Sequence, residues 1–283
     1  MLGREGRRRL TPRRSSFRTI APLTLIPVFG LLAVLVWTFI AQNVRLPAMA
    51  KKAAKKAKLV QVAPRGKIVL ILDDVGFDHQ PVDEAMTIDP NVNFSVLPNA
   101  ARATQVATLL HLRGFEVLCH LPMEPEHFPR VSPGSGAVLT TMSNDEIART
   151  TVANVEAVPF ARGVNNHMGS RATADRRVME SVLAALPEDM YFIDSRTTPA
   201  SVAAAVAREM SVRAASRNTF LDDVASDAAV RHQLRALARE AEQQGIAIGI
   251  GHMYPVTVRV LRAAVPQLKR EGFRFVRASQ VVR

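Results

Sequence analysis

Side chains that could bind a metal ion follow two short apolar runs of this sequence. Two adjacent carboxylates, Asp73 and Asp74, come directly after the run KIVLIL. His120 and Glu124 belong to the stretch CHLPME, which follows a second apolar run. One imidazole and two carboxylates suit Zn²⁺, and they also suit Mn²⁺ or Fe²⁺, so Asp74, His120 and Glu124 are the predicted ligands. A bound divalent ion would bring the pKa of a water molecule to about 7 and polarise a carbonyl group.

Two further residues could move protons beside such an ion. Asp73 could take the proton of the water, and His252, which ends the run IAIGIG, could protonate a leaving amine. Together these groups predict amide hydrolysis without a covalent intermediate. A simpler interpretation exists for each of them, because an Asp-Asp pair often caps the next helix and a single His at a strand end is often a half-buried structural group.

The elements that would position these side chains are apolar runs that alternate with helical patterns. Eight runs predict strands, at 67–72, 92–97, 115–120, 162–166, 190–194, 211–214, 246–251 and 273–277. Ser143 and Glu146 form a capping box that starts one helix, and Ser226 starts another that ends at Gly245. Strands that are apolar on both faces and separated by helices predict a parallel sheet covered by helices. Their number favours a closed (β/α) barrel over an open doubly wound sheet.

Such a barrel would collect the polar strand ends at one rim, because barrels carry their functional groups at the carboxyl ends of the strands. The stretch GVNNHMGSR adds Asn165, Asn166 and His167 to this rim, and YFID adds Asp194. The remaining histidines of the domain lie elsewhere in the pattern and indicate surface positions. Clustering at one rim is what favours a functional over a structural interpretation of these residues.

The basic charge of the chain lies in its first part. The formal net charge is +12, and residues 1–58 hold 13 Lys and Arg against one acid, whereas residues 59–283 hold 24 basic and 24 acidic residues. The folded part is therefore balanced, and we expect no nucleic-acid partner. The single cysteine, Cys119, excludes an internal disulfide.

An uncharged stretch at 20–41 predicts one transmembrane helix. Its 22 residues, at about 1.5 Å each, cross a hydrocarbon core of about 30 Å. Seven arginines precede it, so residues 1–19 are the predicted cytoplasmic tail. A cleaved signal peptide is the alternative, although the apolar run exceeds the usual length of its apolar region. Residues 42–66 indicate a basic linker and residues 67–283 the folded domain.

Five ordered motifs resemble the polysaccharide deacetylases of the NodB-homology type, and specifically the divergent polysaccharide deacetylase family of bacteria. The motifs are LILDDVG, GFEVLCHLPME, GVNNHMGSRAT, FIDSRTT and IGIGHMY, and they cover about residues 65–283. The resemblance implies that Asp73 is the base, that Asp74 and His120 bind the metal, and that Glu124 replaces a second histidine ligand. It also implies a NodB-like deformed (β/α) barrel with about seven parallel strands.

The resemblance further implies roles for the later motifs. Asn166, His167 and Arg171 would contact the substrate or an oxyanion, as would Asp194, and His252 would be the acid. The implied partner is an N-acetylated carbohydrate polymer or fragment, and the implied cofactor is a divalent metal, foremost Zn²⁺. With the predicted anchor, the domain would face the periplasm from the bacterial inner membrane.

Two alternative functions stay open. A glutamate in place of histidine at position 124 lowers the net charge of a divalent site by one unit, which would weaken its Lewis acidity. A catalytically weak or inactive barrel that binds an envelope glycan or protein is therefore one alternative. A metal-dependent esterase or small-amide hydrolase is the other, since it would share the site and differ in substrate. The only tryptophan, Trp37, lies in the predicted span, which argues against a long glycan groove in the domain.

Overall fold

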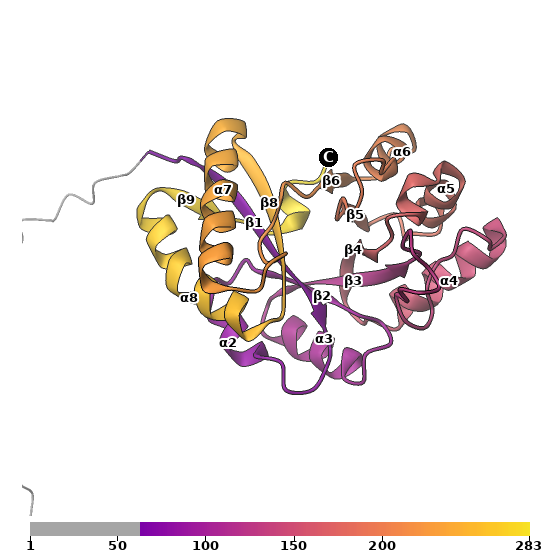
Figure 1. Ribbon diagram of the computed structural model, residues 1–283, viewed down its shortest axis with the longest axis horizontal. Coiled ribbons are helices and arrows are strands. Elements are labelled where there is room, and N and C mark those ends of the chain that lie inside the picture. Colours follow the sequence, from indigo (N-terminus) through magenta and orange to yellow (C-terminus); the bar gives the residue numbers. More distant parts are fainter. Residues whose placement is uncertain (1–62) are drawn as a thin grey trace, which may run out of the picture. The chain divides into compact units, whose positions relative to one another are not determined.

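The structure, a computed structural model, describes residues 63–283, in which parallel strands alternate with helices (Figure 1). The elements are, in chain order, β1 (Gly66–Val75), α2 (Val82–Met86), β2 (Asn93–Val96), α3 (Ala103–Leu112), β3 (Glu116–Met123), α4 (Asn144–Glu156), β4 (Ala161–Met168), η2 (Ala172–Ala174), α5 (Arg176–Ala184), β5 (Tyr191–Asp194), α6 (Ala203–Glu209), β6 (Ala214–Ser216), β7 (Thr219–Phe220), α7 (Asp227–Gln244), β8 (Ile246–His252), α8 (Pro255–Arg270), β9 (Phe273–Phe275) and η3 (Ala278–Gln280). The predicted α/β class with a parallel sheet is confirmed.

The strands form one curled sheet with the order β6-β5-β4-β3-β2-β1-β8-β7, and β9 pairs with β1 beside this path. The two edge strands, β6 and β7, are separated in sequence only by Arg217 and Asn218. The Arg217 amide donates to the Asp194 carbonyl, and the Asn218 amide donates to the Ile248 carbonyl, both at 2.9 Å. One extended segment therefore links the two edges of the sheet. The sheet has nine strands where about seven were predicted, because this segment counts as two strands and β9 pairs with β1 beside the main path. The edge strands β6 and β7 do not pair with each other, so the sheet is a curled half-barrel and not the predicted closed barrel.

Each long strand is buried on both faces, which explains its uninterrupted apolar sequence. The inward side chains form a compact cluster that includes Val69, Ile71, Leu118 and Ile250, and the C-terminal segment adds Val281 to it. Side chains of the opposite face pack against the surrounding helices in a second, larger cluster. The alternation of a strand thus sorts its residues between the barrel interior and the helical layer.

The helix boundaries follow the predicted signals. Ser143 accepts from the Glu146 amide while the Glu146 side chain accepts from the Ser143 amide, which confirms the capping box. Ser226 caps α7, and Gly245 ends it in the left-handed region with φ 82°. The strand predicted at 211–214 exists but lies later in the chain: α6 is followed by a turn in which Ser211 has φ 59°, and β6 runs from Ala214 to Ser216 beside β5.

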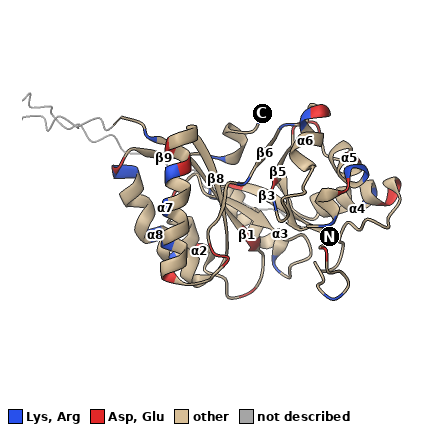
Figure 2. Ribbon diagram, turned by 45° about the horizontal axis from the view of Figure 1, so that its top comes forward, with Lys and Arg blue, Asp and Glu red and all other residues tan. Residues whose placement is uncertain are grey.

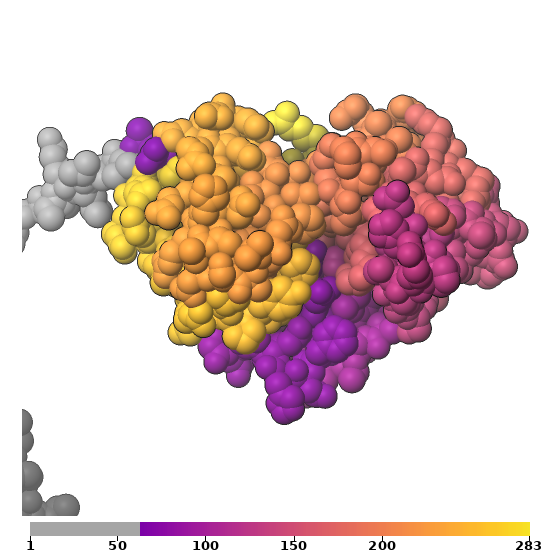
Figure 3. Space-filling view, in the orientation of Figure 1, coloured from indigo at the N-terminus to yellow at the C-terminus, as the bar shows by residue number. Residues whose placement is uncertain are grey.

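Helix α7 carries charges of both signs on its surface, whereas α8 holds Arg and Lys but no Asp or Glu (Figure 2). In the space-filling view, the surface is hollowed between the part that contains α7 and α8 and the part that contains α4 to α6 (Figure 3). The predicted tail, the transmembrane helix at 20–41 and nearly all of the linker lie outside the described residues. Within residues 63–283, no helix combines the length and apolar character needed to cross a membrane.

Candidate active site

A polar layer closes the barrel interior at the carboxyl ends of the strands. Asp73 on β1 lies opposite His252 on β8 in the pairing register, and His120 on β3 lies opposite Asn165 on β4. Ser95 of β2 completes the layer, since its hydroxyl donates to the Asn165 side-chain oxygen. All except His252 are almost fully buried. The rim predicted from the sequence is therefore formed by adjacent strands.

Asp74 reaches the same side as Asp73 because the strand breaks its alternation there. In a regular strand, successive side chains point to opposite faces. Asp74 has φ 58°, and the pairing between β1 and β2 shifts its register between Leu72 and Val75. The Gln80 side chain holds this turn, donating to the Asp74 carbonyl at 2.6 Å and accepting from the Gly76 amide at 2.9 Å. Aspartate is among the residues that tolerate this left-handed conformation.

Three side chains converge on a common point beside this turn. Asp74, His120 and His167 each offer one ligand atom, and these atoms lie within 4.8 Å of one another. Asp74 Oδ1 is 3.4 Å from His120 Nε2 and 3.1 Å from His167 Nδ1, and the two nitrogens are 3.2 Å apart. One carboxylate and two imidazoles form a donor set that suits Zn²⁺ and other borderline divalent ions.

His120 Nε2 has one further charged neighbour, since Asp73 Oδ2 lies 3.5 Å from it. Asp74 Oδ1 is buried without a hydrogen bond. Burial alone would raise the pKa of Asp74, yet the adjacent His120 and His167 hold it far below its ordinary value. Burial alone would likewise lower the pKa of His120, but Asp73 and Asp74 raise it. The surroundings therefore favour a positive charge between these groups, and a divalent ion would fit them.

Glu124 is not in this group, contrary to the ligand set expected from the sequence. β3 stays extended to Met123, so four residues span about 13 Å along the strand, whereas one helical turn would span about 6 Å. The Glu124 carboxylate instead accepts from the amide and hydroxyl of Thr140, at 2.6 and 2.7 Å, and from Arg171 at 3.0 Å. It ties the loop after β3 to the loop after β4.

His167, and not Glu124, is the third residue beside Asp74 and His120. It stands opposite Pro122 in the β3–β4 pairing, two residues beyond His120, so a neighbouring strand supplies the third group. The family resemblance had implied a substrate contact for His167 instead. Asn165 and His167 are two residues apart, so their side chains point to the same face of a strand. Asn165 pairs with His120 on the neighbouring strand, which puts His167 on the same face as His120.

The remaining predicted substrate residues have local partners. The Asn166 side chain accepts from the Ser195 amide at 2.8 Å and donates to the Met168 carbonyl at 2.7 Å. Asp194 accepts from the Arg196 amide at 2.8 Å and from the Ser201 hydroxyl at 2.9 Å. These bonds shape the loops after β4 and β5. Arg171, which binds Glu124, is half exposed.

Asp222, which follows β7, is the site residue that the sequence analysis missed. Its carboxylate is 2.8 Å from His252 Nδ1 and accepts from the His252 amide at 2.7 Å and from the Thr257 hydroxyl at 2.6 Å. Burial alone would lower the pKa of His252, but the bond to Asp222 and the charge of Asp73 raise it to about 9. An Asp-Asp pair that follows an apolar residue, LDD, was the available signal.

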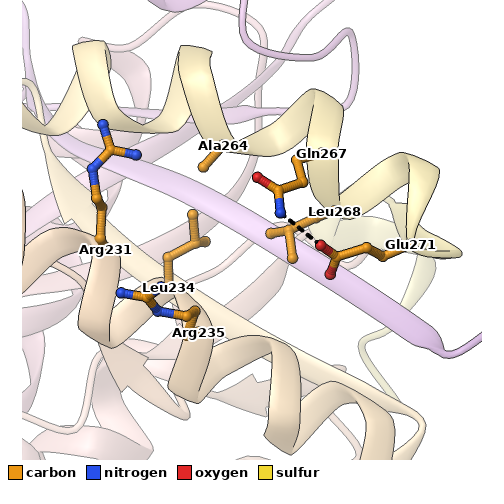
Figure 4. A pocket seen from close by; sticks show the side chains of 7 residues that line it. All are labelled: Arg231, Leu234, Arg235, Ala264, Gln267, Leu268 and Glu271. Atoms are coloured by element: carbon orange, nitrogen blue, oxygen red, sulfur yellow. Dashed lines mark hydrogen bonds between the residues drawn. The ribbon is translucent and has the colours of Figure 1, made fainter.

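A pocket of about 330 Å³ opens beside the converging groups. Its lining includes Asp74, His167 and Phe77 together with the loop segment 132–135. Phe77 is 48% exposed, and Tyr254, which follows β8, is 43% exposed, so two aromatic side chains stand near the rim. Another pocket lies between α7 and α8 (Figure 4), and its lining contains none of the predicted site residues.

The ligand set can be tested with two substitutions. His167→Ala should weaken Zn²⁺ binding by more than about 100-fold because it removes one of three converging groups, whereas Glu124→Gln should leave it within about threefold. Competition titration of the full chain with a chromogenic chelator measures both. Glu124→Gln should instead lower the unfolding free energy by about 1–3 kcal/mol through its lost ion pair and hydrogen bonds. Loss of Zn²⁺ binding in Glu124→Gln at unchanged stability would restore the ligand set expected from the sequence.

The His252–Asp222 pair predicts a pH dependence of stability. A folded pKa of about 9, above the unfolded value of 6.5, stabilises the protein fully below pH 6.5, and this contribution is lost as the pH rises through 9. Its size is on the order of 3 kcal/mol. Asp222→Asn should bring the imidazole pKa back toward 6.5 and flatten the profile. NMR titration and urea unfolding between pH 6 and 10, in chelator, measure both effects, with the exposed Asp223→Asn as control. An unshifted imidazole in Asp222→Asn would contradict the pairing.

Comparisons with known proteins agree with this architecture. The profile of the family described as "Divergent polysaccharide deacetylase" matches residues 70–282. The chain is 36% identical to the uncharacterized protein YibQ of Escherichia coli (strain K12) over 204 residues, and this aligned stretch covers 72% of this chain and 63% of that protein. The chain is 35% identical to an uncharacterized protein of Haemophilus influenzae over 211 residues, and this stretch covers 73% of this chain and 74% of that protein. The chain thus spans less than two thirds of the E. coli relative.

The fold is shared with a solved structure. An uncharacterized protein from Agrobacterium tumefaciens C58 superposes with a TM-score of 0.74 at 19% identity, over 78% of this chain and 90% of that chain. Because the family profile spans most of the folded domain, the resemblance seen in the five motifs is confirmed. The chain belongs to the divergent polysaccharide deacetylase family.

Proposed function

We propose that this protein is a metal-dependent hydrolase that removes the acetyl group from an N-acetylated carbohydrate by hydrolysing its C–N bond. The observation that carries the proposal is the convergence of Asp74, His120 and His167 on one point. Asp73 and His252 flank that point on neighbouring strands. Family membership supports the same class of reaction.

The three converging residues would hold the ion. Zn²⁺ suits two imidazoles and one carboxylate, and Mn²⁺ or Fe²⁺ can share such a site. When bound, a divalent ion supplies a polarised carbonyl and an acidified water molecule. With His167 in the set, the site has two neutral ligands and one anionic ligand. The weakening expected from a second carboxylate at Glu124 therefore no longer applies.

Asp73 is the proposed base. It is 2% exposed, and its two carboxylate oxygens lie 3.0 and 3.1 Å from the Asn165 side-chain nitrogen. Burial raises the pKa of Asp73, and the neighbouring His120 and His252 offset part of that rise. A raised pKa makes the carboxylate a stronger acceptor of a proton from water.

His252 is the proposed acid. Its raised pKa of about 9 keeps a proton on the imidazole at neutral pH. Asp222 holds Nδ1, so Nε2 is the atom that can give a proton to the leaving nitrogen. Base and acid stand on neighbouring strands, which suits the transfer of one proton from water and one to the amine.

The pocket beside Asp74 and His167 supports a short saccharide unit as the substrate. It offers about 330 Å³, and the exposed Phe77 ring in its lining could stack on a sugar face. We further propose that the domain works in the periplasm, anchored to the inner membrane by residues 20–41. That part of the proposal rests on the arginines and the uncharged stretch of the sequence.

Metal content and acetate release test the proposed function. The full chain, purified without chelators, should contain about one divalent ion, and Asp74→Ala and His120→Ala should lose it. Asp73→Asn should keep the ion but release acetate from chitooligosaccharides or peptidoglycan fragments at least 100-fold more slowly, because the base is gone. Asp78→Asn, which changes an exposed carboxylate of the adjacent loop, is the matched control.

Three outcomes would contradict the proposal in different ways. A wild-type chain that neither contains nor binds Zn²⁺ would favour a binding protein for a glycan or protein. Acetate release unchanged in Asp73→Asn would remove the proposed base. Hydrolysis of acetyl esters without any release from N-acetyl sugars would favour the esterase.

A further inference from the structure

We infer that Asn165 is a positioning residue that fixes the tautomer of the metal ligand His120 and at the same time aims the carboxylate of Asp73. The inference rests on the proposed function and deepens it, because it assigns a role to a buried amide that touches both halves of the site. Asn165 is fully buried and stands opposite His120 in the β3–β4 pairing.

Each end of the Asn165 amide has its own partners. Nδ2 lies 3.0 and 3.1 Å from the two oxygens of Asp73 and 3.3 Å from the Ser195 hydroxyl. Oδ1 lies 2.9 Å from His120 Nδ1 and accepts from the Ser95 hydroxyl. No other described side chain bonds both Asp73 and His120 in this way.

The partners determine which way the amide faces. An ionised carboxylate only accepts hydrogen bonds, so the donating Nδ2 must face Asp73. The opposite orientation would place the amide oxygen against the two oxygens of a carboxylate, with only the Ser195 hydroxyl at 3.3 Å able to donate to it, at a cost that burial increases. Oδ1 therefore faces His120 and Ser95.

The orientation of the amide in turn fixes the proton of the imidazole. Since Oδ1 can only accept, His120 Nδ1 must carry the hydrogen, and the lone pair of the neutral ring then lies on Nε2. Nε2 is the atom that faces Asp74 and His167. Asp73, acting through one amide, thus presents His120 to an ion in the ligating tautomer.

Without this amide, nothing would favour that tautomer. A neutral imidazole could place its hydrogen on Nε2 and donate it to Asp74, which would occupy both ligands at once. Partners of this kind typically change metal affinity by 10–100-fold when removed. The same loss would free Asp73 to turn away from the place where a water molecule on the ion would lie.

Asn166 provides a matched control on the next position of β4. It is equally buried, but its amide bonds the Ser195 amide and the Met168 carbonyl and reaches neither Asp73 nor His120. Asn166→Ala should therefore lower the melting temperature without changing Zn²⁺ affinity by more than about threefold.

The test measures Zn²⁺ affinity by chelator competition, melting temperature, and acetate release from chitooligosaccharides, all on the full chain. Asn165→Ala should bind Zn²⁺ 10–100-fold more weakly than wild type. Asn165→Asp should keep the affinity within about threefold, because its carboxylate still accepts from His120 Nδ1 and Ser95. The same variant should lose at least 100-fold in acetate release with the ion bound, because two buried carboxylates that face each other share one proton, which leaves Asp73 a weaker acceptor of the proton of water.

The outcomes separate this inference from the proposed function. Wild-type affinity in Asn165→Ala would overturn the inference and leave the metal centre intact. Equal loss of Zn²⁺ in Asn165→Asp and Asn165→Ala would also overturn it, because an acceptor would then not be what His120 needs. If Asn165→Ala does not fold, Asn165→Asp tests the inference alone. Zn²⁺ affinity near that of wild type together with the expected loss of acetate release supports the inference, and any other combination overturns it. A wild-type chain that binds no Zn²⁺ would overturn both.

Discussion

The left-handed backbone at Asp74 is the constraint on which the candidate site depends. A regular strand would send Asp73 into the barrel and Asp74 into the helical layer, where a carboxylate has no partner. With φ 58° at Asp74, both carboxylates reach the same end of the barrel. A conformation of this kind costs about 1–3 kcal/mol, which the hydrogen bonds of Gln80 to the turn help to offset. Glycine would adopt the turn more easily but would bring no ligand, so aspartate meets both demands.

Two neighbouring carboxylates then acquire opposite properties from their surroundings. Asp73 is buried against an amide, and burial raises its pKa, whereas Asp74 lies between two imidazoles that more than offset its burial. Environments that separate the pKa values of adjacent acids are a recurrent way of dividing catalytic roles. The deeper aspartate is suited to accept a proton and the outer one to stay ionised beside a cation. The division follows from position in the barrel, since both residues have the same side chain.

The sequence was sufficient for the α/β class with a parallel sheet and for most of the rim, because both depend on local patterns. Apolar runs predicted the long strands, and capping residues such as Ser143 and Ser226 predicted helix starts. Local sequence patterns could not show whether Glu124 or His167 joins Asp74 and His120. It depends on β3 remaining extended past His120, which separates positions four apart, and on the pairing of β3 with β4, which brings His167 alongside. Asp222 was missed because the strand before it, β7, has only two residues, too few to be recognised as a strand in the sequence.

The position of Glu124 also connects the candidate site to the pocket wall. Because β4 supplies the histidine, the Glu124 carboxylate is free to hold Thr140, and Arg177 holds the same stretch through the Thr140 and Met142 carbonyls. The loop fixed in this way includes residues 132–135, which line the pocket, and Asn99 bonds the Ser135 carbonyl from the opposite side. A histidine at position 124 would therefore add no ligand here, since an extended strand keeps it about 13 Å along the chain from His120. It would instead remove a buried anion from Arg171 and loosen the wall, so position 124 in this chain shapes the pocket and is not one of the three converging groups.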